Sequence, residues 1–259
     1  MRSNISTKAE IQFAGRLHLP QCQSTNDEMQ AALMQKSGNL PEGFVISTGF
    51  QTAGRGQRGN HWESEPEKNL LFSLLLRPDF LEPRFAFRLT AAIALGIAAA
   101  LEESFPGIRL KWPNDLILDQ KKLGGILTET LISGHRIERA ICGIGLNVNQ
   151  ESLPQHCISL ANASGKTLDR EVVLKKIYAG IFREYQRLRG GKWPEIRSYY
   201  LSRLYRLAEP AWYSLPDGSR FSALLKGIGE EGELILISKE GERRFRFGEV
   251  RFEPALADS

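Results

Sequence analysis

The sequence predicts an α+β fold, with a large mixed domain over residues 1–207 and a small antiparallel β domain over residues 208–259. Apolar β-like runs alternate with helical segments through the larger part. From Ala211 onward only short β-like runs remain, separated by PDG, GEEG and KEG turns, as in a small barrel. With 42% hydrophobic and 25% charged residues, the 259-residue chain is long and apolar enough to bury such a core.

The first predicted strands flank a glycine-rich loop. Residues 43–48 (GFVIST) and 69–78 (NLLFSLLLRP) are apolar and β-like, and the second run is nearly continuous, which is typical of a strand buried on both faces. Residues 84–104 are rich in Ala and Leu and carry charge only near their ends. This pattern predicts a largely buried helix that ends near Pro106.

The remaining elements of the large domain are a meander and two helices. Strand-like segments at 108–112, 123–132 and 136–148 are separated by PND and SGH turns, which predicts neighbouring strands of one sheet. Apolar residues at helical spacing predict a helix over 170–189, ended by a Gly-Gly pair, and a second helical pattern over 194–207.

Composition excludes several classes of protein. The first twenty residues lack the apolar core of a signal peptide, and the longest apolar run, 91–101, is too short to span a bilayer, so we expect a cytoplasmic protein without a membrane partner. Cys22, Cys142 and Cys157 are widely spaced, which favours neither disulfides nor a zinc site. A net charge of +4 suits anionic small molecules as well as nucleic acids.

The loop after the first strand contains G-x-G-x-x-G, formed by Gly54, Gly56 and Gly59. A dinucleotide-binding turn would need a helix after it, and a Walker A loop would need G-K-[ST]; both are missing. Two interpretations remain. The glycines bring backbone N–H groups to an anion, with Arg55 and Arg58 binding carboxylate or phosphate, or the loop is a hairpin with solvated arginines.

Two polar segments each have a structural and a functional interpretation. Thr25 and Glu28 satisfy a T-x-x-E capping box, so helix capping alone can explain the segment around them. Lys111 precedes a WPND turn in which Asn114 and Asp115 are explained either by Asx-turn chemistry or by contact with a phosphate and its Mg²⁺.

Glycines inside two predicted strands indicate a close approach. Lys122 lies in a predicted hairpin turn and is followed by Gly124 and Gly125 in an apolar strand. Gly143 and Gly145 are two residues apart and so share one strand face, which we expect to be bare of side chains. No nucleophile and base pair is evident, which is consistent with a reaction that depends on electrostatic stabilisation.

The ordered set STN, GRGQRG-N-HW, KWPND, KKLGGILTE and GIGLNVN resembles the biotin protein ligases, also called biotin-[acetyl-CoA-carboxylase] ligases. The resemblance implies a catalytic domain related to class II aminoacyl-tRNA synthetases and lipoate ligases, with a mixed sheet flanked by helices and a C-terminal SH3-like barrel. It also implies the reaction: biotin and MgATP give biotinyl-5'-AMP and pyrophosphate, and a lysine of a biotin carboxyl carrier domain then takes the biotinyl group.

The resemblance also assigns roles to residues, motif by motif. The catalytic residues would be Lys122, Arg55 and Lys111. The biotin-binding residues would be Ser24, Thr25, Asn26, Gln51, Gly54, Arg55, Gly56, Gln57, Lys122, Gly125, Gly143 and Gly145. The ATP and adenylate would contact Arg58, Trp62, Asn114, Asp115 and Asn147. Mg²⁺ would arrive with the nucleotide near Asn114 and Asp115, without a metal site made by protein alone.

The sequence departs from the family pattern in two ways. Gln57 stands where some bacterial members have a further arginine, which raises the question of how firmly the adenylate is retained. The chain starts almost directly at the catalytic domain, so we expect no helix-turn-helix domain and no specific DNA binding. Two alternatives stay open, namely lipoate or octanoate ligation on the same scaffold and a basic nucleic-acid-binding module.

Overall fold

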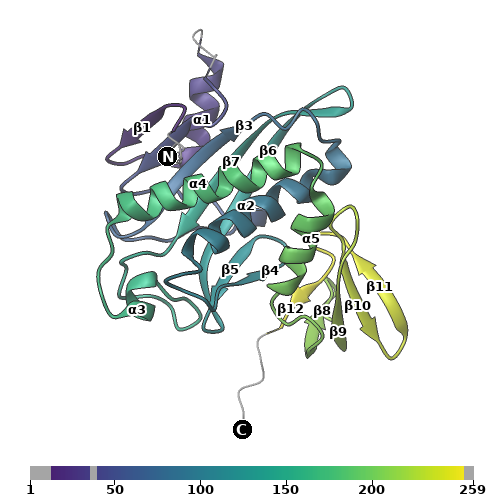
Figure 1. The fold of residues 1–259 in the computed structure, drawn as a ribbon. Coiled ribbons are helices and arrows are strands. Elements are labelled where there is room, and N and C mark those ends of the chain that lie inside the picture. Colours follow the sequence, from purple (N-terminus) through teal and green to yellow (C-terminus); the bar gives the residue numbers. More distant parts are fainter. Residues whose placement is uncertain (1–12, 36–39, 254–259) are drawn as a thin grey trace, which may run out of the picture.

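A seven-stranded mixed sheet organises the larger part of the molecule, in a computed structural model that describes residues 13–35 and 40–253 (Figure 1). The strand order is β1-β2-β3-β7-β6-β5-β4, with β1 and β2 parallel and the other pairs antiparallel. The strands are β1 (Arg16–Leu19), β2 (Val45–Thr48), β3 (Leu70–Leu76), β4 (Arg109–Lys111), β5 (Asp115–Leu118), β6 (Lys121–Ser133) and β7 (Arg136–Leu146).

Helices cover the two faces of this sheet unequally. On one face α2 (Ala86–Leu101) packs beneath α4 (Arg170–Arg189), while α1 (Thr25–Met34) packs on the other face against β2, β3 and β7. A Cβ added at Gly96 would lie 2.6 Å from the Ile181 Cα, so glycine permits α2 and α4 to touch through their backbones. The shorter helical elements are α3 (Leu160–Ser164), α5 (Trp193–Ser202) and the 3₁₀ turns Gln57–Gly59 and Pro83–Phe85.

A second, five-stranded antiparallel sheet follows α5. Its order is β11-β10-β9-β8-β12. It is attached to the first sheet by polar contacts, among them a 2.8 Å hydrogen bond from the Trp112 indole N–H to the Gly232 carbonyl, and one apolar core cluster runs through both parts. The strands are β8 (Pro210–Ser214), β9 (Arg220–Ile228), β10 (Leu234–Ser238), β11 (Gly241–Phe245) and β12 (Arg251–Phe252).

The segment Pro83–Leu101 is long and apolar enough to cross a membrane by length and composition alone. In the fold the middle of this segment is buried, with Ile93 and Ile97 fully so. Packing between the sheet and α4 accounts for this composition.

The α+β class and most predicted elements are confirmed. The helix predicted over 170–189 is α4, and the meander predicted from three segments is the run β4 to β7. Two strands were missed: β1 is a half-exposed edge strand without a continuous apolar run, and β5 begins at Asp115, inside the predicted turn. The helical pattern over 194–207 is shorter than predicted, because α5 ends at Ser202 and an isolated β-bridge pairs Leu204 with Leu110. The boundary predicted near residue 207 remains a prediction.

Candidate active site

A cavity of about 490 Å³ lies on the sheet face that carries α1. Its walls come from the start of α1, the glycine loop, strands β5 to β7 and the segment before and within β12. Of the residues predicted for the site, the cavity brings together Ser24, Thr25, Asn26, Gln51, Arg55, Gly56, Gln57, Trp62, Lys111, Asn114, Asp115, Lys122, Gly125, Gly143 and Gly145. The sequence motifs therefore converge on one cavity although they are dispersed along the chain.

Three predicted residues are not among those that line the cavity. Gly54 is buried behind the loop, where a Cβ would lie 2.6 Å from the Trp62 carbonyl oxygen. Asn147 directly follows β7 and is buried, and its amide Nδ2 donates to the Ile158 carbonyl at 3.2 Å. The Arg58 side chain lies outside the part of the chain that the structure describes.

The polar residues at the start of α1 do not cap the helix. Ser24 is the N-cap residue, and it makes no side-chain cap hydrogen bond, so the predicted Thr25 and Glu28 capping box is wrong. Thr25 faces Gln51 instead. Its backbone N–H donates to Gln51 Oε1 at 2.9 Å, and its hydroxyl Oγ1 lies 3.2 Å from the same oxygen. This finding favours the functional interpretation of the STN motif.

A buried serine, which sequence reasoning missed, joins these residues. Ser73 on β3 is fully buried, and its Oγ lies 2.7 Å from Thr25 Oγ1 and 2.6 Å from Asn26 Oδ1. Asn26 Oδ1 can only accept, so the Ser73 proton goes to it, and the Thr25 hydroxyl must then donate to Ser73 Oγ rather than to Gln51. The available signal was a single polar residue in the otherwise apolar run LLFSLLL.

The glycines of β7 accommodate side chains from other elements. Gly143 pairs with Ser73 on one side and Leu127 on the other, and Gly145 pairs with Gly125. A Cβ at Gly143 would lie 2.5 Å from Asn26 Oδ1, and one at Gly145 would lie 2.6 Å from the Trp62 ring. The expectation of a bare face is therefore corrected, because these neighbours occupy the space that the missing side chains leave.

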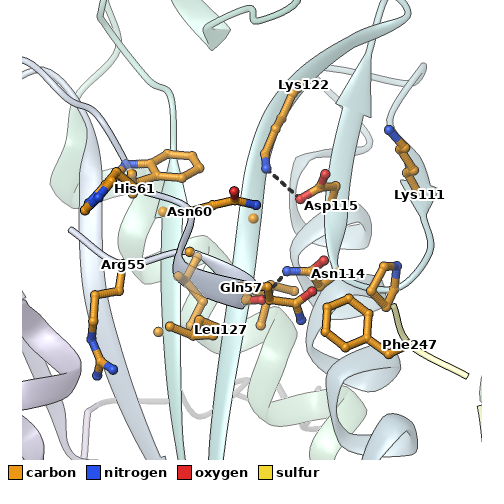
Figure 2. Close-up of a pocket in the computed structure, with 18 of the residues that line it drawn as sticks. Arg55, Gln57, Asn60, His61, Lys111, Asn114, Asp115, Lys122, Leu127 and Phe247 are labelled. Atoms are coloured by element: carbon orange, nitrogen blue, oxygen red, sulfur yellow. Dashed lines mark hydrogen bonds and ion pairs between the residues drawn. The ribbon is translucent and has the colours of Figure 1, made fainter. Parts of the chain in front are cut away.

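The glycine loop folds back on itself and carries Arg55 away from the lysines. The Gly56 N–H donates to the Asn60 carbonyl at 2.6 Å, and a 3₁₀ turn follows. Arg55 Nη2 binds Asp27 Oδ1 at 2.7 Å and Glu129 Oε2 at 3.0 Å. Figure 2 shows the Arg55 guanidinium pointing away from Lys122.

The opposite end of the cavity holds two lysines and a carboxylate. Lys122 Nζ and Asp115 Oδ1 form an ion pair of 2.8 Å between neighbouring strands (Figure 2), and Nζ lies 5.8 Å from the centre of the Trp62 ring. Burial lowers the pKa of Lys111, an effect that the nearby Asp115 carboxylate opposes. Asn114 Nδ2 donates to the Ile126 carbonyl at 2.6 Å, which fixes the turn beside them. This end is built to receive anions.

The second sheet also contributes to the cavity, which the sequence did not predict. Phe247, Val250, Arg251 and Phe252 line it. The ring of Phe252 lies 5.4 Å from Lys111 Nζ, a cation–π contact that places the lysine between the two sheets.

Comparison with known proteins first identifies the class. Residues 19–147 match the model of the biotin/lipoate A/B protein ligase family. This range contains the glycine loop, the WPND turn and the glycines of β6 and β7. It also contains most of the residues that line the cavity.

Relatives with assigned activities narrow the class. The chain is 30% identical over 250 residues to a biotin–[acetyl-CoA-carboxylase] ligase of Paracoccus denitrificans, covering 90% of this chain and 99% of that protein. It is 32% identical over 225 residues to the bifunctional ligase/repressor BirA of Bacillus spizizenii, covering 83% of this chain and 67% of that protein. The Aquifex aeolicus biotin protein ligase, solved with biotin and ATP, superposes with a TM-score of 0.79 at 28% identity, over 94% and 100% of the two chains. The chain belongs to the biotin protein ligases.

We predict that Ser73→Ala destabilises the fold. The change removes a buried donor and leaves Asn26 Oδ1 unsatisfied, which typically costs about 1–3 kcal/mol. Urea unfolding measures the difference in unfolding free energy. Ser202→Ala, at the exposed end of α5, is the control and should change stability little. Equal effects of the two substitutions would show that the Ser73 hydroxyl has no structural role.

Proposed function

We propose that this protein ligates biotin to a lysine of a biotin carboxyl carrier domain, through biotinyl-5'-AMP, at the expense of ATP. The observation that carries the proposal is the convergence of the family motifs on one cavity. One end of the cavity, the amide end, is lined by Ser24, Thr25, Asn26 and Gln51. The other, the cationic end, holds Lys111 and Lys122 with Asp115. A cavity of about 490 Å³ is within the usual size for small-molecule sites. The named relatives and the Aquifex complex with biotin and ATP support the same reaction.

The amide end suits the biotin head group. Ser24, Thr25 and Asn26 are each 3% exposed. With Gln51 they supply both donors and acceptors at the rim of β7. A cyclic urea presents one carbonyl acceptor and two N–H donors, and a buried group of this kind binds well only where each finds a partner. We assign biotin recognition to these four residues on that basis.

The cationic end suits the carboxylate and the phosphates. In the first step a biotin carboxylate oxygen attacks the α-phosphorus, the bond to the bridging oxygen breaks, and pyrophosphate leaves. Both reactants are anions, so Lys122 and Arg55 would reduce their repulsion and stabilise the charge that develops in the transition state. In the second step a carrier lysine amine attacks the acyl carbon, and AMP leaves with the bonding electrons.

Mg²⁺ would enter with the nucleotide. Among the described residues no three His, Cys, Asp or Glu side chains form a metal cluster. Asp115 is a carboxylate at the cationic end, and Mg²⁺ is commonly held by one or two carboxylates together with substrate phosphates and water. The residues therefore fit a cation delivered by ATP, with Asp115 as its protein ligand and Asn114 beside it.

Trp62 would lie beside the adenine. The indole Nε1 is buried and has no hydrogen-bond partner in the described part of the chain, although buried indole N–H groups usually have one. A ligand acceptor, or a movement of the ring off Gly145, would supply it. Asn147 and Arg58, predicted to contact the nucleotide, remain proposals.

Four further proposals concern the whole chain. The larger sheet would be a class II aminoacyl-tRNA synthetase-like catalytic domain ending near residue 207, and the second sheet an SH3-like barrel. Its five-stranded antiparallel order supports the second assignment. A cytoplasmic location is proposed because all three cysteines are free, which suits a reducing compartment. We propose no DNA or membrane partner.

Pyrophosphate release tests the function most simply. With ATP present, biotin should trigger release, and a carrier domain should become biotinylated at one lysine. Absence of biotin-dependent release would refute the proposal. Lipoate and octanoate are tested in parallel, and release with either of these acids in preference to biotin would assign the enzyme to the other branch of the family.

We predict that Lys122→Ala slows adenylate formation by about 10²–10³-fold, as the loss of a preorganised charge typically does. Single-turnover pyrophosphate release measures the step. Lys121→Ala is the matched control, because Lys121 is the exposed neighbour on the same strand. A wild-type rate in Lys122→Ala would remove Lys122 from the reaction.

We predict that Gln57→Arg slows the escape of biotinyl-5'-AMP. Gln57 lines the cavity, and an arginine there would add a charge-assisted hydrogen bond to the adenylate phosphate. The dissociation rate of preformed adenylate in a chase experiment measures the effect. Gln57→Met, similar in length but neutral, should not slow escape; an unchanged rate in Gln57→Arg would mean that position 57 does not contact the intermediate.

A further inference from the structure

Two carboxylates hold Arg55, and the family resemblance assigns a role to neither of them. Asp27 directly follows the STN motif, and Glu129 is the last residue of KKLGGILTE. Arg55 Nη2 binds Asp27 in the first turn of α1 and Glu129 in the middle of β6. The same Glu129 oxygen accepts a 2.6 Å hydrogen bond from Asn26 Nδ2. Glu129 thus joins a residue of the amide end to the cation of the glycine loop.

The hydrogen bonds form one continuous chain across the cavity. From Gln51 it passes through the backbone N–H and hydroxyl of Thr25, then Ser73 and Asn26, to Glu129, and from there to Arg55. Arg55 lies at the end of this chain, so its orientation depends on the residues of the amide end. Any movement of Arg55 toward the lysines must break its contacts with Asp27 and Glu129.

Arg55 is pointed away from the place where its charge would act. The guanidinium lies on the far side of the cavity from the Lys122 and Asp115 pair (Figure 2). Two carboxylates already bind this guanidinium. An anionic substrate would therefore have to compete with Asp27 and Glu129 for this arginine.

We propose that Asp27 and Glu129 are positioning residues that hold Arg55 off the reaction centre until a substrate anion displaces them; this inference rests on the proposed function. The side chains of Arg55, Asp27 and Glu129 are 42%, 52% and 41% exposed. Half-exposed ion pairs are weak, so the two contacts restrain the arginine without locking it. Substrate binding and loop closure are thereby coupled through the two carboxylates.

Calorimetric binding of biotin and of biotin methyl ester tests the proposal. Asp27→Asn removes one of the two carboxylates that bind Arg55, and it leaves the hydrogen bond between Asn26 and Glu129 intact. We expect biotin to bind about two- to fivefold more tightly, the range that exposed ion pairs allow, while the uncharged ester binds as it does to the wild type. Glu129→Gln, which keeps an oxygen for Asn26, should shift the two ligands in the same way.

Glu28→Gln is the matched control. Glu28 is the other acidic residue in the first turn of α1, so its loss changes the local charge and the helix-dipole interaction equally without touching the ion pairs of Arg55. This variant should leave the ratio of biotin to ester affinity unchanged.

Three results would overturn the proposal: weaker biotin binding in Asp27→Asn, an equal change for biotin and its ester, or the same change in Glu28→Gln. The first would mean that Asp27 holds Arg55 ready for the substrate. Biotin-dependent pyrophosphate release by the wild type separates a failure of the proposed function from a failure of the proposed role of the carboxylates. Its absence refutes the function, whereas its presence with any of the three results refutes only the role of the carboxylates.

Discussion

The close approach of two side chains to the backbone of β7 is the constraint on which the site depends. Asn26 lies on Gly143 and Trp62 lies on Gly145, each at a distance that a β-carbon would not permit. Because Asn26 reaches the sheet, the start of α1 can share hydrogen bonds with β3 and β6. Because Trp62 reaches it, the glycine loop closes over the same strands. Helix, loop and sheet therefore come together at these two glycines.

The same two glycines set the spacing of the chemistry. Gly143 is level with the buried Ser73, and Gly145 is level with Gly125, which in turn pairs with Asp115. Residues two apart on a strand are separated by about 7 Å. The amide end and the cationic end of the cavity are therefore neighbouring rows of one pleated surface. A ligand with a polar head at one end and an acid at the other can contact both without a deep pocket.

Much of this was predictable because it depends on local patterns. Glycines with alternate spacing in an apolar strand indicated a close approach, whereas the charged glycine loop by itself left an anion site and a solvated hairpin equally open. The contacts of Ser73 were not predictable, since a lone serine in an apolar run does not disclose its partners. Nor were those of Arg55 with Glu129, which join residues 74 positions apart, one in the glycine loop and one on β6. The part that the second sheet plays in the cavity likewise follows from packing.

A double-mutant cycle at Gly143 and Asn26, read out as biotin affinity by calorimetry, tests the central claim most directly. A methyl group at position 143 must displace the Asn26 carboxamide, so the account predicts roughly tenfold weaker binding in Gly143→Ala, within the energies that contacting residues show. Most of this loss should vanish when Asn26→Ala is already present. Additive effects of the two substitutions, or unchanged affinity in Gly143→Ala, would contradict the claim that this contact organises the site.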